Sequence, residues 1–191
     1  MHIGLFFGSF NPIHIGHLAL ANYMLSFTDM EQVWLVISPH NPLKNKNSLL
    51  NQNDRLHLVN LALEYNTRIK ASTIEFNLPQ PSYTINTLTH LKEKFPQNKF
   101  SLIMGQDNLQ TFEKWKNYEE ILKRYKIYVY PRTISMPSKF DTHPQVQITK
   151  APILEISSTF IRGAIKENKN VEHFMHPAVW EYVKSMGYYK N

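Results

Sequence analysis

Two histidines, His14 and His17, stand three residues apart in the segment 8–17, directly after the apolar run 3–7. The run is typical of a β-strand, and residues 18–25 are typical of a helix. The histidines therefore fall at or just inside the start of that helix. Backbone N–H groups at a helix start are unpaired and carry the positive end of the dipole, so anions bind there. Two imidazoles beside such a site indicate phosphate chemistry.

The histidine pair also fits two other interpretations. Histidines three apart on one helical turn can bind zinc, but the sequence offers no third ligand at metal-site spacing and contains no cysteine. Both side chains could instead be structural. Phosphate binding is favoured because Gly8, Ser9 and a helix start accompany the pair.

The composition is that of a globular protein. With 191 residues, 42% hydrophobic and 19% charged, we expect one domain over residues 1–191. No run approaches the roughly 20 apolar residues that a membrane span needs, so no membrane partner is expected. The first residues lack the features of a signal peptide, which makes a cytoplasmic location the default.

The formal net charge of +6 fits two kinds of partner, a nucleic acid or a polyphosphate. The lysines are spread along the chain, which argues against a basic tail or a dedicated nucleic-acid stripe. We therefore expect no nucleic-acid partner, although charge alone does not decide between a binding protein and an enzyme.

Strand-like and helix-like segments alternate along the chain, with residues 156–191 forming a small helical subregion. This alternation predicts an α/β fold, a Rossmann-like doubly wound parallel sheet covered by helices on both faces. The expected strands are 3–7, 32–38, 69–76, 99–104, 126–130 and 146–148. The expected helices are 18–25, one capped by Asn53 or Asp54, one following 82–84, then 108–112, 118–123, 155–166 and 176–189.

Four polar turns follow predicted strands, at 8–17, 39–44, 105–107 and 131–132. The carboxyl ends of parallel strands lie at one edge of the sheet, and ligands bind there. The sequence therefore predicts that these turns gather into an active site.

The segment 8–17, ending in His14-Ile15-Gly16-His17, resembles the signature of the nucleotidyltransferase superfamily with the H-x-G-H motif. The same four residues spell a motif of class I aminoacyl-tRNA synthetases. A synthetase needs a much longer chain and a lysine-rich second signature, and neither is present.

Later segments resemble the bacterial nicotinate mononucleotide adenylyltransferases within that superfamily, and the likeness covers essentially the whole chain. The similar segments are 82–84 with 87–88, 105–109 with Trp115, 156–162, and 176–179 through 187–189. The resemblance implies adenylyl transfer from ATP to nicotinate mononucleotide, giving deamido-NAD and pyrophosphate in NAD biosynthesis. It implies Mg²⁺ bound with the ATP and no dedicated metal site on the protein. The oligomeric state is left open, and a homo-oligomer is compatible with the sequence.

The resemblance places ATP against the first motif and the segment 156–162. His14, His17 and Arg162 are the implied catalytic residues, with His17 nearest the reacting α-phosphate. Ser157 or Ser158 could act only as a helix N-cap, and Arg162 could form only a surface ion pair. The implied ATP-binding residues are Gly8, Ser9, Phe10, His14, His17, Gly105, Asp107, Ile156, Ser157, Ser158, Thr159 and Arg162.

The resemblance places the mononucleotide against aromatic and basic residues. Trp115 would stack on the pyridinium ring, while Tyr83 and Thr84 would hold the carboxylate. Trp115 could instead be a core residue, and Thr84 only a helix cap. Two loops depart from the family pattern, since Lys44 stands where histidine is usual and Arg132 follows Pro131 instead of preceding it. The implied residues are Ser9, Phe10, Lys44, Tyr83, Thr84, Trp115 and Arg132.

Two rival functions remain at this stage. A pantetheine-phosphate adenylyltransferase shares the first motif and the serine-rich segment but lacks the features at 82–84 and Trp115. A non-catalytic nucleotide- or RNA-binding protein would use the basic edge, and its RNA binding would weaken steeply with salt.

Overall fold

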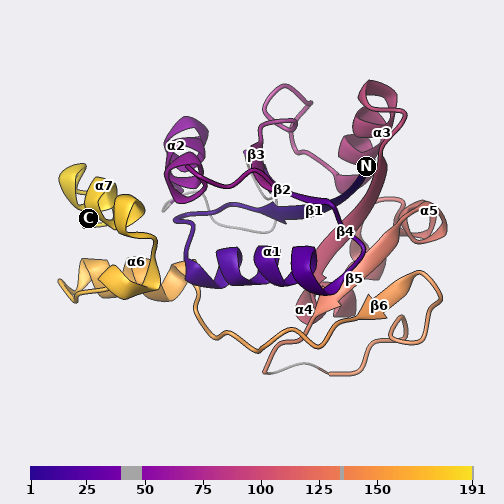
Figure 1. Ribbon diagram of the computed structural model, residues 1–191. Helices are drawn as coiled ribbons and strands as arrows, with labels where there is room; N and C mark the ends of the chain where they lie inside the picture. The colour runs from indigo at the N-terminus through magenta and orange to yellow at the C-terminus, as the bar shows by residue number, and fades with distance from the viewer. Residues whose placement is uncertain (40–48, 134–135, 191) are drawn as a thin grey trace.

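A six-stranded parallel sheet forms the centre of the computed structural model, which describes residues 1–39, 49–133 and 136–190 (Figure 1). The strand order is β3-β2-β1-β4-β5-β6, so the winding direction reverses between β1 and β4. This confirms the predicted doubly wound α/β fold. The strands are β1 His2–Gly8, β2 Gln32–Ile37, β3 Ile69–Ser72, β4 Lys99–Gly105, β5 Lys126–Tyr130 and β6 Val146–Ile148.

Helices pack against both faces of the sheet. Apolar residues of α1, α2, α6 and α7 join one core cluster, and those of α3, α4 and α5 join the other. Figure 1 shows α6 and α7 beside the N-terminal end of α1. The helices are α1 Ile15–Phe27, α2 Gln52–Ala62, α3 Thr84–Lys94, α4 Gln106–Gln110, α5 Tyr118–Arg124, α6 Ser158–Lys166 and α7 Pro177–Ser185.

The central strands are buried on both faces, which explains their continuous apolar sequences. In β4, Leu102 and Met104 belong to one core cluster while Ile103 belongs to the other. In β5, Val129 and Tyr128 divide in the same way. Side chains alternate across a strand, so a strand between two helical layers needs apolar residues at every position.

Two predicted boundaries were wrong. The third strand ends at Ser72 instead of residue 76, because the chain turns there. In this turn the Phe76 N–H donates to the Thr73 carbonyl at 2.9 Å. This turn carries Glu75 inward, where only 2% of its surface is exposed. The cap of α2 is Asn51, whose Oδ1 accepts the N–H of Asn53 at 2.9 Å, and not Asn53 or Asp54.

The fourth and last helices also differ in extent from the sequence pattern. The segment predicted as 108–112 is helical from Gln106 to Gln110, and a 3-10 turn follows at Phe112–Lys114. The helix α7 ends at Ser185, before the predicted end, and Gly187 adopts a φ of 64°. The N–H groups of Gly187 and Tyr188 donate to the carbonyls of Lys184 and Val183, each at 3.1 Å. This pattern is a Schellman motif, which reverses the chain after α7.

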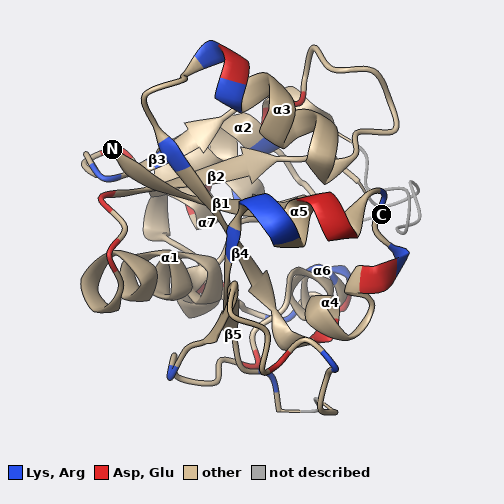
Figure 2. Cartoon of the chain, turned by 90° about the vertical axis from the view of Figure 1, so that its right-hand side faces the viewer, with Lys and Arg blue, Asp and Glu red and all other residues tan. Residues whose placement is uncertain are grey.

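The surface charges of both signs are mixed. In Figure 2, lysines and arginines are scattered among acidic segments, and α5 carries Glu119 and Glu120 in its first turn and Lys123 and Arg124 in its last. Such an arrangement complements the helix dipole. Among the described helices, none has the length and apolar character needed to cross a membrane.

Candidate active site

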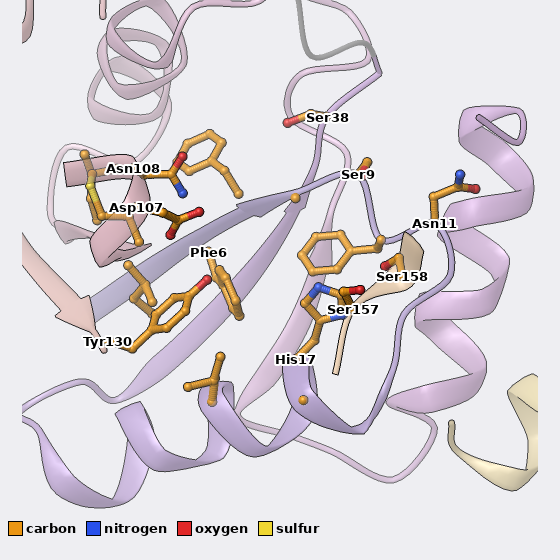
Figure 3. Close-up of a pocket in the computed structure, with 18 of the residues that line it drawn as sticks. Phe6, Ser9, Asn11, His17, Ser38, Asp107, Asn108, Tyr130, Ser157 and Ser158 are labelled. Atoms are coloured by element: carbon orange, nitrogen blue, oxygen red, sulfur yellow. The ribbon is translucent and has the colours of Figure 1, made fainter. Parts of the chain in front are cut away.

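A cavity of about 740 Å³ lies at the carboxyl edge of β1, β4 and β5. Its wall includes the turn after β1, the start of α1, the start of α6 and the residues that follow β4 and β5. In Figure 3, Asp107 and Tyr130 lie on one side of this hollow, and His17, Ser157 and Ser158 lie on the other. Of the four predicted turns, three therefore meet, and most of the fourth lies outside the described residues.

Most of the predicted site residues line this one cavity. Gly105 does not line it, but a Cβ there would clash with Asp107 Oδ1 and come within 3.2 Å of the Tyr130 ring, so this glycine makes room for two residues of the wall. Lys44 lies outside the described residues. The predicted residues that line the cavity are Gly8, Ser9, Phe10, His14, His17, Tyr83, Thr84, Asp107, Trp115, Arg132, Ile156, Ser157, Ser158, Thr159 and Arg162.

The two histidines stack on each other at the start of α1. His14 is the N-cap residue, and the ring centroids of His14 and His17 are 3.7 Å apart with 28° between the planes. The backbone N–H of His14 donates to His17 Nδ1 at 3.3 Å. Because Nδ1 accepts this bond, the proton of a neutral His17 sits on Nε2. His17 therefore offers the cavity an N–H donor without needing a positive charge.

His14 is buried, with 5% of its surface exposed, and Gly16 makes room for its ring. A Cβ on Gly16 would stand 3.1 Å from both Nδ1 and Cε1 of His14, which gives the glycine of the H-x-G-H motif a steric reason. Burial, with a smaller contribution from the positive charge of Arg132, lowers the pKa of His14 to about 4. His14 is therefore neutral near pH 7. Its Nδ1 has no hydrogen-bond partner among the described residues.

The start of α6 holds the turn that precedes the histidines. Ser157 caps the helix, accepting the N–H of Phe160 at 3.1 Å, so the N-cap prediction is confirmed for Ser157. Ser158 Oγ donates to the Pro12 carbonyl at 2.9 Å, and Arg162 Nη1 donates to the Asn11 carbonyl at 2.8 Å. The surface ion pair considered for Arg162 is wrong, because its partners are this carbonyl and Thr159.

Sequence reasoning missed Arg55, which joins the ends of β1 and β2. Its side chain is completely buried, and Nη1 donates to the carbonyls of Ser9 at 2.7 Å and Ser38 at 2.8 Å. Further bonds reach the carbonyls of Pro39 and Leu50. The available signal was an arginine on the apolar face of α2, one turn before Leu58 and Val59.

The far end of the cavity is aromatic and basic. Tyr83 is the N-cap of α3 and Thr84 its first residue, so the interpretation of Thr84 as the cap is wrong. Lys116 Nζ lies 4.6 Å from the centroid of the Tyr83 ring. Trp115 is half-buried, packs against Phe112 with ring centroids 5.3 Å apart, and also lines the cavity. The core interpretation of Trp115 therefore holds in part, and its binding role stays a prediction.

Cations outnumber carboxylates in the cavity wall. The cations are Lys114, Lys116, Arg132 and Arg162, and the carboxylates are Glu75 and Asp107. Glu75 already accepts the hydroxyls of Ser82 at 3.0 Å and Thr87 at 2.7 Å, while Asp107 lies 3.7 Å from Arg132 Nε. The described residues contain no group of three histidines or acids placed to hold a metal ion. The wall suits an anionic ligand.

The fold and this site define an α/β nucleotidyltransferase. Residues 5–164 match the cytidylyltransferase-like family, and the chain belongs to that family. Individual relatives belong to a more specific class of enzyme than this broad family. Proteins of Flavobacterium johnsoniae and Flavobacterium psychrophilum, each a probable nicotinate-nucleotide adenylyltransferase, are 56% and 57% identical to this chain over the full length of both sequences.

Solved structures have the same α/β fold. The Plasmodium falciparum nicotinic acid mononucleotide adenylyltransferase complexed with NaAD superposes with a TM-score of 0.84 at 18% identity. The aligned part covers 99% of this chain and 97% of that one. At this identity the structural likeness shows the α/β fold alone.

Proposed function

We propose that this protein transfers the adenylyl group of ATP to the phosphate of nicotinate mononucleotide, forming deamido-NAD and pyrophosphate for NAD biosynthesis. The observation that carries the proposal is the paired histidines at the start of α1, which share one positively charged cavity with the start of α6. The full-length relatives at 56% and 57% identity support the choice of substrates.

The reaction needs little covalent chemistry from the protein. An oxygen of the mononucleotide phosphate attacks the α-phosphorus of ATP, and the bond from that phosphorus to the oxygen bridging to the β-phosphate breaks. The electron pair of that bond leaves with pyrophosphate. Both reactants are already ionised, so no side chain must remove a proton. The protein contributes by aligning the two phosphates and by stabilising the charge that moves onto the leaving group.

The two helix starts supply the donors for the ATP phosphates. The Nε2–H of His17 donates to the α-phosphate, where charge is redistributed during transfer. The free backbone N–H groups at the start of α6 and the guanidinium of Arg162 bind the β- and γ-phosphates. Mg²⁺ would be held by the ATP phosphates and water, which is the usual mode of this ion at polyphosphates. Bound there, it neutralises phosphate charge.

The mononucleotide occupies the aromatic and basic end of the cavity. Trp115 stacks on the pyridinium ring, and the N–H groups at the start of α3, beside Tyr83 and Thr84, receive the carboxylate. Lys116 adds a positive charge next to Tyr83. Lys44 and Arg132 are predicted to contact the mononucleotide. Arg132 lines the cavity next to Asp107.

A pyrophosphate-release assay tests this function. The protein is given MgATP with nicotinate mononucleotide, nicotinamide mononucleotide or phosphopantetheine in separate reactions, and with MgATP alone as the control. We expect release with nicotinate mononucleotide, accompanied by a dinucleotide product of the matching mass. The proposal would be refuted if phosphopantetheine were the one acceptor that supports release, or if no acceptor supported it.

A further inference from the structure

The chain segment that follows α7 returns to the turn after β1. The hydroxyl of Tyr189 donates to Asn11 Oδ1 at 2.9 Å, joining residues 178 positions apart. Asn11 lies between the strand β1 and the histidine pair and lines the cavity. A residue remote in sequence therefore contacts the phosphate-binding turn directly.

The backbone after α7 is shaped to make this contact. The Schellman motif at Gly187 reverses the chain, and Tyr189 itself adopts a φ of 67°. The left-handed region is unfavourable for a residue with a side chain, so it persists only where surrounding contacts hold it. Its contacts include the hydrogen bond to Asn11 and packing against one core cluster.

Asn11 connects several parts of the site. Only 3% of its surface is exposed, and its Oδ1 accepts the N–H of Leu50 at 3.2 Å as well as the Tyr189 hydroxyl. Two bonds to the same oxygen fix which way the amide faces. The carbonyl of Asn11 accepts Arg162 Nη1 at 2.8 Å. A shift of Asn11 would therefore move the guanidinium that the proposed function assigns to the ATP phosphates.

The Tyr189 hydroxyl is a permanent donor. Burial raises its pKa well above the ordinary value, although the neighbouring positive charges of Arg162 and Arg55 act in the opposite direction. The hydroxyl therefore keeps its proton throughout the pH range in which an enzyme is assayed. The hydroxyl can therefore donate to Asn11 throughout that range.

We propose that Tyr189 is a positioning residue for adenylyl transfer, which holds Asn11 and, through it, Arg162 in the geometry of the reaction. The proposal rests on the proposed function, because Arg162 matters for catalysis only if a polyphosphate lies against it. It assigns the reversed segment after α7 to the active site and not only to the core.

The test compares Tyr189→Phe with Tyr188→Phe. Each variant loses one hydroxyl from neighbouring residues, but the Tyr188 hydroxyl faces Asp54 and Tyr182 instead of the turn. For Tyr189→Phe we expect kcat to fall about tenfold, since small misplacements in a site of this kind are costly, while the KM for the mononucleotide changes less than about twofold. Tyr188→Phe is expected to keep the wild-type kcat.

Amide hydrogen exchange gives a second readout that is independent of activity. Residues 8–17 are expected to exchange faster in Tyr189→Phe and at the wild-type rate in Tyr188→Phe. A wild-type kcat in Tyr189→Phe, or equal losses in both variants that follow their loss of thermal stability, would overturn the proposal. If the wild-type protein shows no adenylyl transfer, the proposed function fails, and the exchange result alone decides whether Tyr189 holds the turn.

Discussion

Acid should destabilise this protein partly through one buried imidazole. His14 is held neutral by burial and by Arg132, with its pKa lowered from 6.5 to about 4. Replacing it by glutamine, in His14→Gln, removes the titration and leaves a neutral polar side chain. The two proteins should therefore differ in how their free energy of unfolding depends on pH.

The sign follows from proton counting. Between the two pKa values, the unfolded chain binds a proton at His14 and the folded chain does not, so stability rises with pH in this range. The contribution is complete above the unfolded value of 6.5 and is lost as the pH falls toward the folded value of about 4. Going from about pH 7.5 to about pH 4.5, this one group lowers the free energy of unfolding by about 2.5 kcal/mol.

Urea unfolding at several pH values measures this effect. The wild type should lose about 2 to 3 kcal/mol more than His14→Gln over that pH range, after the acid sensitivity of all other groups cancels in the comparison. The matched control is His173→Gln, which replaces an exposed histidine and should keep the wild-type slope. Parallel pH curves for the wild type and His14→Gln would refute the buried, neutral assignment of His14.

Three further changes test separate parts of the site. His17→Ala should lower kcat by about 10²-fold or more while leaving mononucleotide binding intact, measured by steady-state kinetics and calorimetry; near-normal turnover would contradict its role. Trp115→Ala should raise the KM for nicotinate mononucleotide about tenfold and spare that for ATP, whereas equal losses would make Trp115 structural. Arg55→Met should cost about 3 kcal/mol of unfolding free energy in urea, since it removes the donors of several partly buried carbonyls. A change below about 1 kcal/mol would show that water replaces them.

The sequence was informative where one signal repeated itself along the chain. Apolar runs alternating with helical patterns predicted the sheet, and the turns after β1, β4 and β5 were predicted to meet because parallel strands end at one edge. Ser157 or Ser158 could be predicted as a cap because the rule for caps depends on neighbouring residues only, and the structure selects Ser157. Local rules and the topology of a parallel sheet predicted the meeting of the turns around the histidines, whereas the family resemblance supplied Tyr83, Thr84, Trp115 and the segment 156–162.

Long-range polar contacts escaped prediction for a physical reason. Arg55, Glu75 and Tyr189 find their partners on other elements, so nothing nearby in sequence reveals those partners, although the apolar face of α2 signals that Arg55 is buried. Their burial depends on carbonyls and hydroxyls that arrive from other elements, such as Ser9 for Arg55 and Asn11 for Tyr189. The wrong end of β3 has the same origin, because the turn there serves the buried carboxylate of Glu75.

Residues of types that enzymes use in catalysis also meet at the opposite edge of the sheet, where burial of the serine excludes catalysis. His2 Nε2 lies 2.7 Å from Ser101 Oγ, and His2 Nδ1 lies 3.2 Å from Asp29 Oδ2, the order of groups in a serine hydrolase triad. Ser101 has no exposed surface, so no substrate carbonyl can approach its oxygen. Tyr128 donates to the same Asp29, so the cluster links strands β1, β4 and β5 to the exposed Asp29 in the loop before β2. At the other edge, His14 and His17 sit where the strands end, beside helix starts and a cavity of about 740 Å³. Both edges have histidines with close polar neighbours, but it is at the carboxyl edge that a cavity gives a phosphate access to the histidines.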